Sequence, residues 1–316
     1  MSIRSCGLDI QPTCRRVLRW QSRGVDEDPL KDYWGSWDDT YSRLRLALDA
    51  SPMVNRYRLP VPAGLNADWF ESVGDHLITA DYFLQCDGPL DPWQKIDPTF
   101  KRSAGRTLAI SHTWSFREHP DQWPAEVDKN GVLVYPQLYF LQTLAHANPD
   151  CVFFYDYCSL PQPDRTPEEE AIFIKGLRDT ARLYSSCQVV QFATDDLYFE
   201  RAWCLLETFC HLFSKNDRAL AVVSFDNPAF VTCLCQLIEG AKYAEENDSS
   251  FGGWRERLIG MVRDGKVTVP RDKEFVLEMM ASLDLGDYTG IDTEDRGCID
   301  WINPRGVMRL SGLNIT

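Results

Sequence analysis

Short apolar runs separated by longer helical stretches dominate the chain from residue 107 onward. Four of these runs are roughly five to seven residues long, rich in β-branched and aromatic side chains, and without strict alternation of polar and apolar positions. That pattern is typical of parallel strands covered on both faces. It predicts strands at residues 107–111, 151–156, 188–193 and 219–225.

Three stretches between these runs are long enough for crossover helices, at residues 135–147, 166–186 and 199–213. The second begins with Thr166-Pro-Glu-Glu-Glu, which supplies a cap, a proline at the first helical position and acidic residues in the first turn. The alternation predicts an α/β fold, a doubly wound parallel sheet with right-handed crossovers. In such sheets ligands bind beyond the carboxyl ends of the strands.

Mainly helical segments flank this region. Residues 33–50 and 66–85 have helical character, with Asn66 as a cap for the second. Residues 1–100 show no catalytic pattern and are interpreted as an N-terminal extension or accessory subdomain. The α/β domain is then assigned to 101–265 and a C-terminal extension to 266–316, with helices predicted at 230–241, 251–264 and 272–283 and no assignment for 284–316.

Composition narrows the function classes. The net charge of −14 at pH 7 argues against a general nucleic-acid or anionic-membrane surface, which requires basic stripes. The eleven cysteines show no CxxC pair or metal-ligand spacing, so we expect reduced thiols and no metal site. No apolar run approaches about 18 residues, and the start lacks a signal-like apolar core. The expectation is a soluble, cytoplasmic protein.

Polar and aromatic side chains follow each of the first three predicted strands, and the carboxyl ends of parallel strands meet at one edge of a sheet. The chain contains no GxGxxG, Walker A or GxSxG sequence. It therefore lacks the common glycine-rich loops that bind nucleotide phosphates and the nucleophile turn of α/β-hydrolases. His112 and Cys158 both follow strands and form a conceivable nucleophilic pair, although a loop cysteine is far more often inert. The candidate substrate contacts are Ser111, His112, Trp114, Arg117, Asp156, Tyr157, Ser159 and Trp203.

Glu207 is the candidate catalytic residue of the third predicted crossover helix. At about 100° per residue, it lies just beyond an apolar arc that includes Leu206 and Phe209, with Trp203 one turn earlier at the edge of the arc. A carboxylate there is either a solvated boundary residue or a working acid in a cleft, and the helical pattern alone leaves both open. The sequence leaves two roles open for Asp156, capping its own loop or facing a ligand.

Three motifs resemble those of a TIR (Toll/interleukin receptor) domain, in a divergent form. They are Ser111-His-Thr-Trp, Tyr155-Asp-Tyr-Cys-Ser-Leu-Pro-Gln, and Arg201-Ala-Trp-Cys-Leu-Leu-Glu207. The resemblance covers residues 107–225. The chain departs from the usual pattern in a long loop after the first strand and in a proline- and acid-rich segment, residues 161–170.

The resemblance implies a flavodoxin-like fold and, in enzymatic members, cleavage of the nicotinamide–ribose bond of NAD or transfer of its ADP-ribosyl group. It places the catalytic glutamate at Glu207, with NAD as substrate and no bound prosthetic group. Tyr157 and Trp203 are then candidates for ring stacking, and Ser111, His112 and Arg117 for the ribose or phosphates. The family also suggests a homo-oligomer acting in signalling or immunity. Two alternatives remain, a non-catalytic interaction module and a nucleoside (deoxy)ribosyltransferase-like enzyme.

Overall fold

The computed structural model describes residues 76–114, 119–120, 136–192, 198–212, 220–223, 259–282, 299–303 and 306–310. The helices predicted at 33–50 and 230–241 lie outside these residues. The strands form one sheet in the order β2-β1-β4-β3-β5-β6-β7-β8. Their bounds are β1 Leu77–Thr79, β2 Lys101–Arg102, β3 Arg106–His112, β4 Cys151–Phe154, β5 Gln188–Phe192, β6 Leu220–Val223, β7 Ile299–Asn303 and β8 Gly306–Leu310.

The sheet is mixed, with a parallel centre and antiparallel edges. Strands β4, β3, β5, β6 and β7 pair in parallel, whereas β1 and β2 at one edge and β8 at the other pair antiparallel. The prediction of an α/β fold is confirmed, but the predicted sheet was wholly parallel. The antiparallel strands come from segments flanking the strand–helix repeats, which the sequence pattern did not assign to the sheet.

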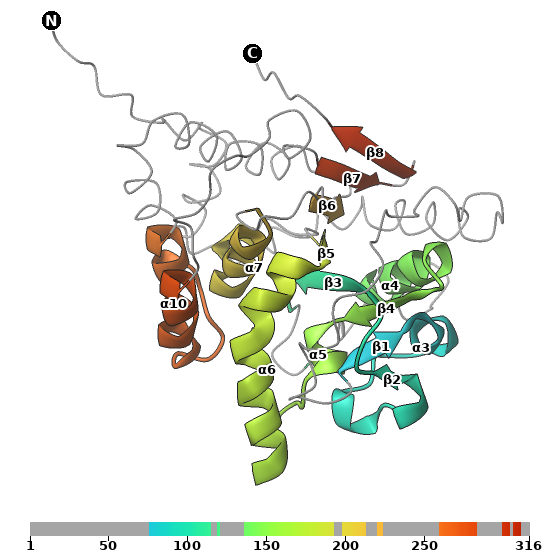
Figure 1. The fold of residues 1–316 in the computed structure, drawn as a ribbon, viewed down its shortest axis with the longest axis horizontal. Coiled ribbons are helices and arrows are strands. Elements are labelled where there is room, and N and C mark those ends of the chain that lie inside the picture. The colour runs from blue at the N-terminus through green and yellow to red at the C-terminus, as the bar shows by residue number, and fades with distance from the viewer. Residues whose placement is uncertain are drawn as a thin grey trace, which may run out of the picture.

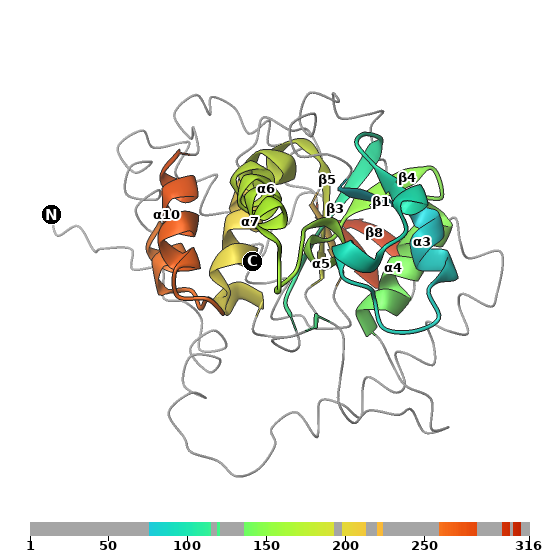
Figure 2. The same cartoon turned by 90° about the horizontal axis from the view of Figure 1, so that it is seen from below.

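Helices cover both faces of the sheet, as Figures 1 and 2 show. Helices α3 and α4 lie on one face, and α6, α7 and α10 lie on the other. Their bounds are α3 Ala80–Gln85, α4 Pro136–Ala147, α5 Asp156–Ser159, α6 Pro167–Ser186, α7 Ala202–Leu212 and α10 Asp272–Ser282, with single 3-10 turns at Trp93–Lys95, Pro98–Phe100 and Tyr198–Glu200. The predicted crossover helices are thus present as α4, α6 and α7, and Thr166 caps α6 in a full capping box.

Two predicted elements were wrong in part. Residues 77–79, inside the helix predicted at 66–85, form strand β1, because Leu77 and Ile78 are almost fully buried and Ile78 pairs with Phe153 of β4. Tertiary pairing here overrides the local helical pattern. Strand β4 ends at Phe154, two residues earlier than predicted, and Asp156 instead begins helix α5.

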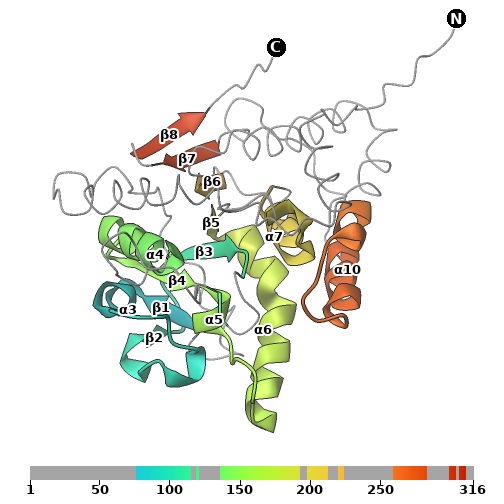
Figure 3. The same cartoon turned by 180° about the vertical axis from the view of Figure 1, so that it is seen from behind.

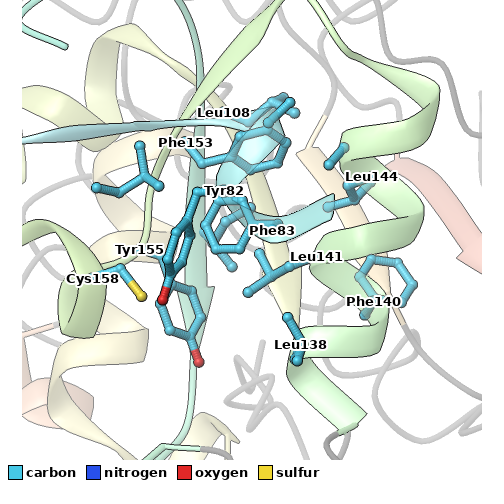
Figure 4. Packing of buried hydrophobic residues seen from close by; sticks show 14 of the residues in the cluster. Tyr82, Phe83, Leu108, Leu138, Phe140, Leu141, Leu144, Phe153, Tyr155 and Cys158 are labelled. Carbon is cyan, nitrogen blue, oxygen red and sulfur yellow. The ribbon is translucent and has the colours of Figure 1, made fainter. Parts of the chain in front are cut away.

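The core is divided between the two faces of the sheet. On the α4 face, aromatic rings interlock edge to face, with Phe83 5.2 Å from Phe153 and Phe140 4.4 Å from Phe192 between ring centroids. Figure 4 shows this cluster from close by, with Tyr155 at the end nearest α5. Neighbouring β3 residues divide between the faces, because Leu108 and Ile110 pack with α4 while Ala109 packs with α6 and α7. The alternation fixes which way each later β3 side chain points.

The start of α7 is held by a neighbouring segment of the chain, seen beside α10 in Figure 3. The Ala202 N–H donates to the Lys266 carbonyl at 3.0 Å, and the Lys266 N–H donates to the Glu200 carbonyl at 2.5 Å. This pairing requires a glycine next to it, because a Cβ on Gly265 would lie 2.9 Å from the backbone of Ala202. The orientation of α7 therefore depends on Gly265. Among the described helices, none has the length and hydropathy needed to cross a membrane.

We expect Gly265→Ala to destabilise the protein by about 1–3 kcal/mol, because backbone atoms rather than a flexible side chain must move to admit the new methyl group. The measurement is the free energy of unfolding in urea. Gly260→Ala is the matched control, since Gly260 has open space around its Cβ position and lies in the helical residues 259–264 of the same segment. The control should be neutral or stabilising by up to about 1 kcal/mol. Equal effects of the two substitutions would contradict the packing argument.

Candidate functional site

The end of β3 places two polar side chains on opposite faces of the sheet. The register pairs Ala109 with the last residue of β4, so residues 110–112 extend beyond β4 and pair only with β5. Ser111 points to the α7 face and His112 to the α4 face, following the alternation of the strand. Because β4 ends early, the first turn of α5 lies next to this protruding strand end. The candidate residues therefore gather at the carboxyl edge of the parallel strands.

On the α7 face, a short chain of hydroxyl groups leads to Glu207. The Ser111 hydroxyl donates a hydrogen bond to Glu207 Oε2 at 2.5 Å. The same hydroxyl is hydrogen-bonded to the phenol of Tyr198, and both Ser111 and Tyr198 are completely buried. The Glu207 side chain itself is partly exposed. A single carboxyl group is thus anchored by a buried hydroxyl, on a residue that is partly exposed.

Burial dominates the protonation of Glu207. It raises the pKa of the Glu207 carboxyl well above its usual range, and the hydrogen bond from Ser111 opposes that rise. The negative charge of Asp156 raises the pKa of Glu207 further. Within the described part of the chain, no cation forms an ion pair with Glu207.

On the α4 face, Asp156 is a second carboxylate with the opposite behaviour. Its Oδ1 contacts His112 Nε2 at 2.7 Å and accepts from the Tyr157 N–H at 2.6 Å, while Oδ2 accepts from the Trp114 indole at 3.0 Å. Burial opposes ionisation of Asp156, but the attraction of His112 and these three hydrogen bonds outweigh it and lower the pKa of Asp156. The side chain is 40% exposed, so the anion reaches solvent.

Stacked aromatic rings support this second carboxylate. The His112 ring lies parallel to Tyr155, with 4.1 Å between centroids and 10° between planes. The Tyr155 phenol, directly after β4, donates to Gln137 Oε1 of α4 at 2.6 Å. Tyr157 meets Trp114 and His119 edge to face at 5.6 and 4.8 Å. Burial raises the pKa of Tyr157 to about 12 and lowers that of His119.

Not every predicted contact joins this group. The Ser159 hydroxyl is fully buried and accepts from the Tyr155 N–H at 3.0 Å, so it holds the loop rather than facing solvent. Trp203 lies one turn before Glu207, and its ring packs against Phe275 of α10 at 6.3 Å between centroids. Arg117 lies outside the described residues. The structure therefore brings together Glu207 with Ser111, and Asp156 with His112, Trp114 and Tyr157.

Cys158 is not placed as a nucleophile. Its thiol donates to the Asp91 carbonyl at 3.4 Å, and burial raises the pKa of Cys158 well above its usual range. A thiol in such surroundings stays protonated and inert. Among the described residues, no group of three or more His, Cys, Asp or Glu side chains is arranged to hold a metal ion.

Two tyrosines of the site were missed by the sequence analysis. Tyr198 was inside the motif region and carried no assigned role, although it anchors Ser111. Tyr184, near the end of α6, donates to the Ile110 carbonyl at 2.8 Å, one residue before Ser111. Nothing in the local pattern distinguishes Tyr184 from an ordinary packing residue. Only the crossing of α6 over β3 brings its hydroxyl to the site.

A hollow of about 590 Å³ lies elsewhere, at the start of α6. It is lined by residues around the start of α6 and by residues 269, 271 and 272 around the start of α10, and by none of the candidate site residues. Burial raises the pKa of Asp272, and a hydrogen bond from Trp203 opposes this.

No family model, curated protein or solved structure matches the chain. The assignment of function therefore rests on the site geometry and the motifs.

The raised pKa of Glu207 predicts a pH-dependent stability. Because the folded pKa exceeds the unfolded value near 4.5, protonation favours the folded state. This contribution is complete below the unfolded pKa and is lost as the pH rises through the folded pKa. Glu207→Gln removes the ionisation. From about pH 5 to about pH 8, the melting temperature of Glu207→Gln should therefore rise relative to that of wild type by at least about 2 °C.

The measurement is thermal unfolding across this pH range for both proteins. Glu278→Gln, at an exposed position of α10, is the control, and its melting curve should track that of wild type at every pH. A constant difference between the Glu207→Gln and wild-type melting temperatures across this range would show that the pKa of Glu207 is not raised.

Proposed function

We propose that this chain is a TIR-like enzyme that cleaves the nicotinamide–ribose bond of NAD, with Glu207 as its catalytic carboxylate. The observation that carries the proposal is the placement of Glu207, partly exposed and held by the buried Ser111 hydroxyl at the carboxyl edge of the parallel strands. The sequence motifs Ser111-His-Thr-Trp and Trp203-Cys-Leu-Leu-Glu207 meet at this one place.

The strand order supports a flavodoxin-like fold for the domain. Counted along the chain, the five parallel strands β3, β4, β5, β6 and β7 lie in the order second, first, third, fourth, fifth, which is the flavodoxin-like order. In that class the strand order reverses between the first and third strands, here β3 and β5, and ligands bind in the crevice outside their carboxyl ends. Ser111 and His112 are the last residues of β3 and lie at this reversal.

The chemistry of the bond fits a lone carboxylate. Loss of nicotinamide leaves positive charge on the anomeric carbon and ring oxygen of the ribose, and an adjacent carboxylate stabilises that charge. Water or another acceptor then adds to the anomeric carbon and loses a proton. In the ligand-free site Glu207 favours its protonated form, and a cationic substrate lowers its pKa and favours the carboxylate that the transition state needs.

A non-catalytic interaction module is the second candidate. Glu207 already accepts a hydrogen bond from Ser111, which in turn is tied to Tyr198, so the carboxyl has internal partners without any ligand. This network alone could serve to fix α7 against β3. A nucleoside (deoxy)ribosyltransferase-like reaction is the remaining enzymatic alternative, using the same carboxylate on a different glycosidic bond.

Nicotinamide release from NAD tests the proposal. Wild type should turn over, and Glu207→Gln should lose at least about 10²-fold in kcat/KM, the loss expected when a key transition-state contact is removed. Gln preserves the shape of the side chain and its hydrogen bond from Ser111, so folding is retained. Glu278→Gln should keep wild-type activity.

The assay is best run over a wide range of protein concentration, because we expect the family to work as oligomers. Equal rates for wild type and Glu207→Gln would refute the assignment of the catalytic residue. No nicotinamide release at the highest concentration would favour the interaction module. Release of a free base from nucleosides, without NAD cleavage, would favour the transferase-like alternative.

A further inference from the structure

A buried tyrosine is linked to Glu207 through the Ser111 hydroxyl. Tyr198 begins the single 3-10 turn Tyr198–Glu200 before α7, and it is completely buried. Its phenol is hydrogen-bonded to the Ser111 hydroxyl, which is hydrogen-bonded to Glu207 Oε2 at 2.5 Å. These three groups form a continuous series of hydrogen bonds, which we call the hydroxyl chain. The bond-cleaving chemistry assigned to Glu207 uses only the carboxyl at its end.

The position of Tyr198 is fixed by contacts that do not involve its phenol oxygen. The Arg201 N–H donates to the Tyr198 carbonyl at 3.2 Å. Lys266 holds the same turn, because its N–H donates to the Glu200 carbonyl at 2.5 Å and its Nζ donates to Glu200 Oε2 at 2.6 Å. The Tyr198 ring meets Phe199 edge to face, with 5.4 Å between centroids. Tyr198→Phe therefore removes one oxygen and keeps these contacts.

The Ser111 hydroxyl has two partners among the described residues but only one proton. An ionised carboxylate can only accept, so Ser111 donates to ionised Glu207 and accepts from Tyr198. A protonated carboxyl can donate from Oε2 to Ser111, whose own proton then points to Tyr198. Both hydrogen bonds are kept in each form of Glu207, and both reverse their direction when Glu207 gains or loses its proton.

The arrangement with ionised Glu207 is the stronger of the two. A hydrogen bond to a charged acceptor is roughly twice as strong as one between neutral groups. A hydroxyl that itself accepts a hydrogen bond is polarised and donates more strongly, and the low polarity of a protein interior strengthens each bond in the series. The phenol of Tyr198 thus stabilises the ionised form of Glu207 more than the protonated form, without touching the carboxyl.

The other titratable groups around Glu207 keep their protonation state while it titrates. Burial raises the pKa of Tyr198, of Tyr184 on α6 and of Cys210 on α7, so these three groups stay protonated. Burial opposes the ionisation of Asp156 on α5, but the neighbouring histidine and three hydrogen bonds lower the pKa of Asp156, and it stays ionised. A proton exchanged within this group near neutral pH therefore belongs to Glu207.

We propose that Tyr198 is a positioning residue for Glu207 that acts through Ser111, donating to the Ser111 hydroxyl when Glu207 is ionised and accepting from it when Glu207 is protonated. The hydroxyl chain thereby holds the carboxyl in one place in both forms and favours the ionised form. The inference rests on the proposed function only for its consequence in catalysis, where the transition state needs the ionised carboxylate. Its main test requires no substrate.

The test is a pH titration of the Glu207 carboxyl by carbon-13 NMR, on the full chain labelled at the side-chain carboxyl carbon of glutamate. The Glu207 resonance is the one missing from Glu207→Gln. Tyr198→Phe should raise the pKa of Glu207 by about 0.5–1 unit. Ser111→Ala removes the direct donor and should raise it by at least about 1 unit. Adding Tyr198→Phe to Ser111→Ala should give no further rise, because the link is already broken.

Tyr82→Phe is the matched control. Tyr82 is also buried, and its phenol accepts from the Asp91 N–H at 2.8 Å on the α4 face of the sheet. Its loss should leave the titration of Glu207 unchanged. An unchanged or lowered pKa of Glu207 in Tyr198→Phe would overturn the proposal. An equal rise in the Ser111→Ala background would also overturn it, because Tyr198 would then act without Ser111, and so would an equal rise in Tyr82→Phe.

A measurement on wild type replaces the variants should Tyr198→Phe or Ser111→Ala fail to fold, as judged by circular dichroism. With tyrosine labelled at the ring carbon that carries the hydroxyl, one resonance should titrate with the midpoint of Glu207, because the Tyr198 phenol changes from donor to acceptor. The same resonance should not titrate in Glu207→Gln. Absence of such a resonance would contradict the reversal of the hydroxyl chain and overturn the proposal.

The outcome is separable from that of the proposed function. The expected shifts without nicotinamide release would leave this inference standing and refute the NAD-cleaving role. Nicotinamide release with an unshifted carboxyl would leave the enzymatic role standing and refute this inference. If wild type releases nicotinamide, the pH at which kcat/KM reaches half its maximum should rise in Tyr198→Phe by the same amount as the carboxyl titration, and the absence of that rise would refute a positioning role in catalysis.

Discussion

The pairing of β3 with both β4 and β5 is the constraint from which the site follows. The strand is buried on both faces and paired along both edges, so neither its register nor its facing can slip without exposing a core residue. Because β4 stops opposite Ala109, the last part of β3 protrudes past it. The side chains of the consecutive residues Ser111 and His112 point to opposite faces, and each is hydrogen-bonded to a carboxyl group. The division of the site into two halves is thus a consequence of strand geometry.

The two carboxyl groups are hydrogen-bonded to consecutive residues of β3, and their surroundings shift their pKa values in opposite directions. For Glu207, burial outweighs the hydrogen bond from Ser111, and the proton is retained. For Asp156, three donors and the attraction of His112 outweigh burial, and the proton is lost. Such a pair is a common arrangement in active sites, because one group stays anionic while the other exchanges a proton or ionises on demand. The negative charge of Asp156 itself helps to keep Glu207 protonated.

The sequence predicted the parts of this arrangement that local pattern controls. The central strands, the crossover helices and the cap at Thr166 follow from periodicity and from turn chemistry, although β4 ends two residues early and helix α5 was not predicted. Strand β1 did not follow, because its pairing with β4 is a long-range contact that outweighs the helical pattern of its own segment. Motifs near the strand ends predicted three residues of the site, namely Glu207, Ser111 and Asp156. Tyr184 was not, because its hydroxyl reaches the site only through the packing of α6 on β3.

A buried network of this kind can exist for structure alone, and the identity of residue 207 argues against that. Holding α7 to β3 through the Ser111 hydroxyl requires only an acceptor, which a glutamine supplies without any cost of ionisation. A carboxyl group in the same place loses solvation, has no cation paired to it among the described residues, and is further disfavoured by the charge of Asp156. An acid kept where an amide would be more stable, on a residue that is partly exposed, favours the proposal that Glu207 acts on a ligand.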